Sequence, residues 1–85
     1  MANYSIEIKK SATKEMAKLP KVHLQRIVEK IQALSTTPRP EGCKKLSADE
    51  KYRIRVGNYR ILYSIEDNQL IVYVVKIGHR KEVYR

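Results

Sequence analysis

The spacing of the apolar residues changes from a helical to an alternating period in the middle of this 85-residue chain. Ahead of Thr36 the strongest stripe recurs every three or four positions, at Leu24, Ile27, Val28, Ile31 and Leu34. After Gly42 apolar and polar residues alternate, which is the two-residue period of β-strands. Residues 36–42 are rich in Thr, Pro and Gly and predict the turn between the two halves. A helical half followed by a strand half indicates an α+β domain.

An N-terminal strand and two helices are predicted ahead of this turn. Residues 4–9 alternate in polarity and favour a strand. Ser11 fits the N-cap of a first, short helix. Pro20 ends that helix and suits the first turn of a second one, which runs from Lys21 to about Ser35. Together the two helices would form a hairpin with one apolar face and one basic face.

Three further strands are expected to follow as an antiparallel meander, over Tyr52–Val56, Tyr59–Ile65 and Leu70–Ile77. Gly57-Asn58 is a strong two-residue hairpin signal because both residues tolerate a positive φ. Asp67-Asn68 is the next turn, residues 43–46 fit an additional short strand, and Gly78 is expected to end the last one. We therefore predict one domain over residues 1–85, in the order β-α-α-β-β-β, with the helices on one face of the sheet. The last strand is apolar on both sides, which suits an interior position.

Composition limits the classes of partner and compartment. A hydrophobic content of 42% can pack a core, and the net charge of +9 favours an anionic partner: nucleic acid, an acidic protein or an anionic surface. The apolar run at 70–75 is too short to span a bilayer, and no secretory signal opens the chain. Cys43 is the single cysteine, which excludes an internal disulfide. We therefore expect a cytoplasmic protein with no membrane partner. Cys43, His23 and His79 lack the spacing of metal ligands, so we expect no metal and no cofactor.

A row of arginines is the feature that the fold does not require. Arg53 and Arg55 point to one face of their strand, opposite the apolar residues between them. Arg60 and Arg80 lie at strand ends that a meander brings near the same face. Like charges repel, so this arrangement suggests a polyanion as partner. The alternative is that these arginines form the solvated face of an amphipathic strand.

If the polyanion is RNA, arginines can stabilise the charge of the transition state as its 2′-hydroxyl attacks the phosphorus. They are poor general bases because the pKa of arginine exceeds about 12. His79 and Tyr84 are the candidate proton acceptors, and Tyr84 could equally stack on a base or anchor the chain end. Four lysines could contact RNA phosphates or remain solvated: Lys44, Lys45, Lys76 and Lys81.

The segments 52–63 and 75–80, with Val83-Tyr84, resemble the RelE branch of the RelE/ParE toxin superfamily, and the similarity spans essentially the whole chain. This resemblance implies the toxin half of a type II toxin–antitoxin pair, neutralised by a cognate antitoxin. It also implies an endoribonuclease that cleaves mRNA in the ribosomal A site. Cleavage would proceed by metal-independent 2′-hydroxyl attack and would inhibit translation. The toxin–antitoxin complex would bind operator DNA through the antitoxin.

The resemblance assigns the basic positions of the family to particular residues of this chain: Arg53, Arg55, Arg60 and Arg80, with Tyr84 as the C-terminal tyrosine. Some members carry lysine in place of Arg53 and Arg55, so charge stabilisation is the expected role here. The spacing from Arg80 to Tyr84 is also shorter than in some members. Two alternatives stay open: a ParE-like inhibitor of DNA gyrase, and a non-catalytic relative that only binds its antitoxin.

Overall fold

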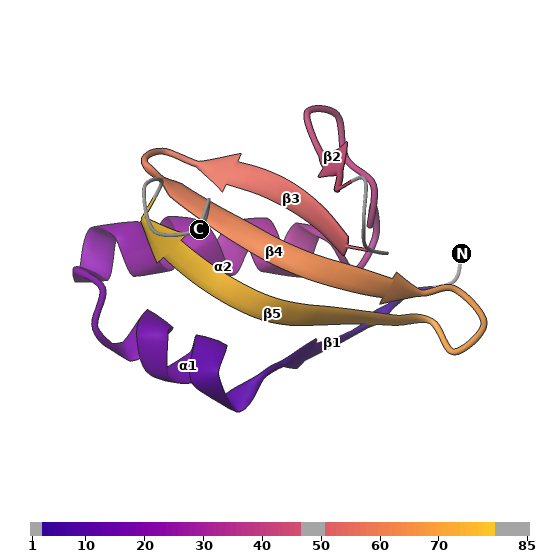
Figure 1. Cartoon of the computed structure of the whole chain (residues 1–85), viewed down its shortest axis with the longest axis horizontal. Helices are drawn as coiled ribbons and strands as arrows, with labels where there is room; N and C mark the ends of the chain where they lie inside the picture. The colour runs from indigo at the N-terminus through magenta and orange to yellow at the C-terminus, as the bar shows by residue number, and fades with distance from the viewer. Residues whose placement is uncertain (1–2, 47–50, 80–85) are drawn as a thin grey trace.

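The computed structural model describes residues 3–46 and 51–79, and it confirms the predicted α+β architecture (Figure 1). The elements in chain order are β1 (Ser5–Ile8), α1 (Lys10–Ala17), α2 (Lys21–Ala33), β2 (Lys44–Lys45), β3 (Lys51–Val56), β4 (Tyr59–Glu66) and β5 (Ile71–His79). The expected short strand at 43–46 is present as β2, so four strands follow the helices. Both helices lie behind one face of the sheet, and the other face is left uncovered by helices.

The sheet has the strand order β1-β5-β4-β3-β2. Strands β2 to β5 pair antiparallel in sequence order, which confirms the meander. The first strand differs, because β1 runs parallel to β5 and makes the sheet mixed. Strand β5 therefore has a neighbour on each side, and its predicted interior position is confirmed.

The predicted N-cap at Ser11 is wrong, because α1 already begins at Lys10. The backbone N–H of Lys9 still donates to the carbonyl of Val74, at 2.8 Å, so strand pairing runs up to the start of the helix. Lys9 is thus the N-cap residue, and its side chain makes no capping hydrogen bond. Pro20 directly precedes α2 as its N-cap, in agreement with its predicted place between the helices.

The core lies between the helices and the sheet. The helices contribute Ala12, Ile27, Ile31 and Leu34, and the strands contribute Ile54, Ile61, Tyr63, Val72, Val74 and Ile77. Burying one such large side chain contributes about 1.5–3 kcal/mol. The apolar stripe predicted for α2 and the alternation predicted for β3 and β4 therefore meet in one core.

The last strand departs from prediction near its end. Gly78 does not end it, since Gly78 pairs with Arg60 and His79 pairs with Tyr59. A register shift between Leu62 and Tyr63 leaves Val75 as an extra residue of β5, a β-bulge. The bulge reverses which face the following residues of β5 point to. Val72 and Val74 before the bulge and Ile77 after it are therefore all in the core. Without the bulge, Ile77 would point to the face opposite to Val74.

Tyr63 fastens the turn between α2 and β2 to the sheet. Its side chain is fully buried, and its hydroxyl donates a 2.8 Å hydrogen bond to the carbonyl of Pro38. The ring also stacks on Tyr52, with 5.8 Å between the ring centroids. Burial raises the pKa of the Tyr63 hydroxyl, because the phenolate would lose its hydration.

A second contact joins the same turn to the β4–β5 turn. The guanidinium of Arg39 donates to both carboxylate oxygens of Asp67, at 2.9 and 3.3 Å. Tyr4 donates to the same carboxylate at 2.7 Å. These hydrogen bonds, led by the one from Arg39, lower the pKa of Asp67. The N-terminal segment, the turn after α2 and the β4–β5 turn are therefore tied together at this end of the sheet.

We expect Tyr63→Phe to lower the free energy of unfolding by about 1 kcal/mol at neutral pH, because it leaves the Pro38 carbonyl without its donor. Since the pKa of Tyr63 is raised on folding, its contribution is fully present below the unfolded pKa of about 10 and is lost as pH rises through the folded value. Urea unfolding of both proteins from pH 7 to 11 measures this. The difference should shrink above pH 10, and a constant difference would contradict the assigned cause.

Candidate functional site on the open face of the sheet

The side chains on the uncovered face of the sheet are mostly cationic at one end. Ile54 is buried under the helices, so its neighbours on β3 point to the opposite face. Cross-strand pairing then places six residues there, which we call the basic face: Lys44, Lys51, Arg53, Arg55, Arg60 and Lys76. The predicted grouping of Arg53, Arg55 and Arg60 on one face agrees with this arrangement.

One row of the basic face crosses four strands. Lys44 lies opposite Arg53, Arg53 opposite Leu62, and Leu62 opposite Lys76. Directly opposed residues have Cβ atoms about 4.5–5.5 Å apart, so Lys44 and Arg53 are close neighbours. Three of these four positions are cationic and none is acidic, with Leu62 between Arg53 and Lys76.

The next row holds Arg55 directly opposite Arg60. The carbonyl of Lys51 accepts a hydrogen bond from the N–H of Leu46, at 2.8 Å, so it points toward β2. Backbone groups alternate along a strand, so those of Arg55 point the same way and not at β4. Arg55 and Arg60 thus form a non-hydrogen-bonded pair, whose Cα atoms are only about 4.5 Å apart. Two guanidinium side chains therefore leave the sheet side by side.

The two arginines differ in exposure. Arg55 is exposed, whereas Arg60 retains 1% of its accessible surface. A buried cation has a high desolvation cost and interacts with other charges through a lower effective dielectric than a surface cation does. Arg60 is therefore a fixed internal charge beside the exposed Arg55, a difference that the sequence pattern did not reveal.

The structure separates His79 from the arginines. Its ring lies edge-on to that of Tyr59, with 5.8 Å between centroids, on the face that the helices cover. The bulge at Val75 is the reason, because an unbroken alternation from Val74 would have put His79 on the basic face. Lys45 is likewise paired with Tyr52, so it leaves its strand on the face opposite to Lys44.

Three of the predicted site residues lie outside the described residues: Arg80, Lys81 and Tyr84. Lys51, by contrast, belongs to the basic face, although the strand predicted from the sequence began only at Tyr52. Its place two residues before Arg53 was the available signal. Within residues 3–46 and 51–79 no three His, Cys, Asp or Glu residues gather in a metal-binding arrangement. In the same part of the chain, neither helix is both long and apolar enough to cross a membrane.

Comparison with known proteins assigns the family. A family model described as "ParE toxin of type II toxin-antitoxin system, parDE" matches residues 6–84. The toxin RelG of Mycobacterium tuberculosis is 32% identical over 85 aligned residues, which cover 96% of this chain and 97% of RelG. This chain belongs to the RelE/ParE toxin family.

Two further relatives place this toxin near the RelE members. The mRNA interferase toxin RelE of Escherichia coli is 28% identical, with 95% of this toxin and 90% of the relative covered. The RelE–RelB complex of Pyrococcus horikoshii is a solved structure with 30% identity and a TM-score of 0.84, covering 92% of this toxin and 96% of the matched chain. The toxin therefore has the RelE fold.

We expect Arg55→Gln to stabilise the toxin, because it removes one of two directly opposed like charges. The gain should be about 0.5 kcal/mol, which corresponds to a rise of about 2–4 °C in Tm for a domain of this size. Thermal unfolding at low ionic strength measures it, and added salt should reduce the difference. Lys14→Gln is the control, since Lys14 is exposed on α1 and lies outside the basic face. A lower Tm for Arg55→Gln would contradict this account.

Proposed function

We propose that this toxin is a ribosome-dependent endoribonuclease that cleaves mRNA in the A site. The observation that carries the proposal is the Arg55–Arg60 pair within a basic face on a rigid sheet. The name of the E. coli relative, an mRNA interferase, supports the same activity. Arg55 is exposed directly opposite the buried Arg60, so a phosphate that binds Arg55 would also lie near the positive charge of Arg60.

The proposed reaction needs no external nucleophile. The 2′-oxygen attacks the adjacent phosphorus, the bond from phosphorus to the 5′-oxygen breaks, and the products are a cyclic phosphate and a 5′-hydroxyl. Arg53, Arg55 and Arg60 would neutralise the charge that develops on the phosphorane oxygens. One positioned donor of this kind contributes on the order of 10²–10³ in rate. These cations can supply the charge that a metal ion would otherwise supply, so we propose metal-independent cleavage.

The proton of the 2′-hydroxyl needs an acceptor other than arginine. His79 lies on the opposite face, so we leave it out of the proposed set. From the family resemblance we propose Arg80 as a further phosphate ligand and Tyr84 as the residue that stacks on the base or accepts the proton. Lys44, Lys51 and Lys76 would hold the flanking phosphates, because they extend the basic face on both sides of Arg53.

The proposed partners follow from the relatives. Solved structures of RelE–RelB complexes support a cognate antitoxin for this toxin, and we propose the ribosome and its mRNA as the target. The complex would bind operator DNA through the antitoxin, and the toxin would act in the cytoplasm. The family model carries the ParE name, so inhibition of DNA gyrase is the second candidate function.

We expect Arg55→Gln to lower mRNA cleavage on the order of 10²–10³-fold, because it removes an exposed donor to the scissile phosphate. Arg55→Lys should retain part of the activity, since it keeps the charge and loses the bidentate geometry. The measurement is primer extension on mRNA from cells that express each variant, next to a gyrase supercoiling assay with purified toxin.

Lys14→Gln serves again as the control and should cleave like the wild type. Because Arg55→Gln is expected to be the more stable protein, its loss of activity would not reflect unfolding. Intact mRNA with inhibited supercoiling would refute the nuclease and favour the ParE-like function. Intact mRNA with normal supercoiling would leave antitoxin binding as the function.

A further inference from the structure

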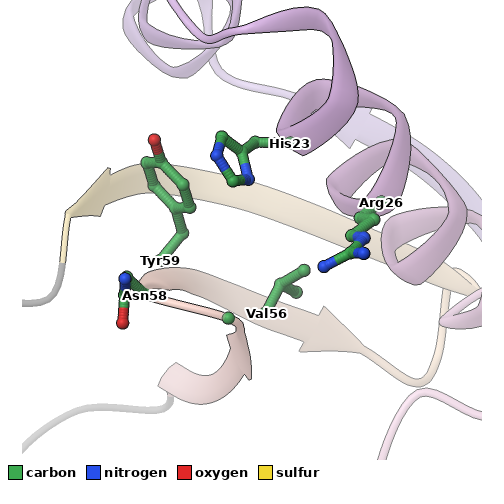
Figure 2. Close-up of a pocket in the computed structure, with 6 residues that line it drawn as sticks. His23, Arg26, Val56, Asn58 and Tyr59 are labelled. Carbon is green, nitrogen blue, oxygen red and sulfur yellow. The ribbon is translucent and has the colours of Figure 1, made fainter.

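The β3–β4 hairpin also lines a hollow on the helix side of the sheet, behind its tip. Val56 and Tyr59 are the pair next to Arg55 and Arg60, and they point to the helix side of the sheet. There the hairpin and α2 enclose a hollow of about 190 Å³ (Figure 2). Its lining comes from both elements: His23, Arg26, Val56, Gly57, Asn58 and Tyr59.

The side chains of His23 and Arg26 bring hydrogen-bond donors to the hollow, and none of the described residues that line it is a carboxylate. Figure 2 shows His23 and Arg26 extending from α2 toward the hairpin, with the guanidinium of Arg26 turned toward Val56. Within the described part of the chain Arg26 has no ion pair with an acidic residue. Tyr59 adds a hydroxyl that can donate, whereas Figure 2 shows the amide of Asn58 turned away from His23 and Arg26. This set suits an anionic oxygen group such as a phosphate.

Two rings form one side of the hollow. The His23 and Tyr59 rings are 5.4 Å apart between centroids and are inclined by 51°. Both side chains are partly exposed, so a planar group entering the hollow can contact them. Aromatic side chains next to a cation are the combination on which single-stranded nucleic acids stack their bases. An acidic peptide would use the cation but would have no need of the rings.

The hollow and the arginine pair are adjacent along the chain. They are one residue apart on each strand, about 3.3 Å along the hairpin, on opposite faces of the sheet. The tip between them is exposed at both of its residues, Gly57 and Asn58. Apart from the adjacent residues of the chain, no atom lies within 4 Å of the place where a Cβ of Gly57 would be. An RNA strand can therefore pass over the tip from one face to the other.

We propose that this hollow binds a nucleotide that flanks the cleavage site, with its phosphate on Arg26 and its base against His23 and Tyr59. The proposal rests on the proposed function, because it assumes that RNA occupies the basic face. It assigns the tip of the hairpin as the point at which the substrate strand turns around the toxin. Recognition of sequence beside the cleavage site would then come from α2 as well as from the sheet.

The test measures the binding of two fluorescent single-stranded RNAs by anisotropy, a trimer and a nonamer, both with 2′-O-methyl sugars so that neither is cleaved. The trimer can occupy the basic face alone, whereas the nonamer can also reach the hollow. Arg26→Gln should weaken nonamer binding about tenfold and reduce the slope of log affinity against log salt by about 0.7. It should leave trimer binding unchanged. His23→Ser should weaken nonamer binding to a smaller extent.

Lys14→Gln removes the same charge from an exposed position outside the hollow and should bind both RNAs like the wild type. Suppose that Arg26→Gln binds the nonamer like the wild type while Arg55→Gln weakens the binding of both RNAs. The hollow is then refuted as an RNA site, and the proposed function stands. If Arg26→Gln weakens the nonamer while Arg55→Gln leaves the trimer unchanged, the hollow binds RNA without the basic face, which refutes the basic face as the RNA site and overturns the assignment of the hollow to a nucleotide beside the cleavage site. A nonaglutamate peptide tests the acidic-protein alternative: a loss of peptide binding in Arg26→Gln as large as the loss of RNA binding would overturn the assignment to RNA.

Discussion

The register of the β3–β4 hairpin determines where every candidate functional group of this toxin lies. Gly57 adopts a φ of +60° at the two-residue tip, so the turn closes with Val56 opposite Tyr59 and Arg55 opposite Arg60. A slip by one residue would exchange the two faces of the hairpin. The core packing of Ile54 and Ile61 opposes such a slip, because it would expose both side chains. The apolar core thus holds the two arginines together against their repulsion.

Much of this arrangement follows from local sequence. Alternation over residues 52–56 was sufficient to place Arg53 and Arg55 on one face, and the Gly57-Asn58 signal was sufficient to predict the hairpin. The apolar stripe of α2 needed no tertiary information either, since a helix repeats every 3.6 residues. These features were predictable because each depends on residues that are neighbours in the chain.

The features that were not predictable depend on distant pairing. The bulge at Val75 arises between β4 and β5, and it alone moves His79 to the helix side. The parallel pairing of β1 with β5 joins the two ends of the described chain. The burial of Arg60 and the hollow beside Arg26 come from packing between elements, which alternation does not encode. Sequence reasoning therefore found the basic strand, but two residues of its proposed site, Lys45 and His79, lie on the opposite face.

Cationic and acidic side chains lie at opposite ends of the open face. Among the described residues, the carboxylates of this face lie away from the arginine pair: Glu66 is six residues from Arg60 on the same strand, about 20 Å, and Glu7 is on the outermost strand. The ion pair of Arg39 with Asp67 lies at that far end too. A polyanion is therefore attracted to one end of the sheet and repelled from the other. That polarity favours an RNA path that follows the basic residues of β3 to the arginine pair and continues over the hairpin tip, as a hollow behind the tip requires.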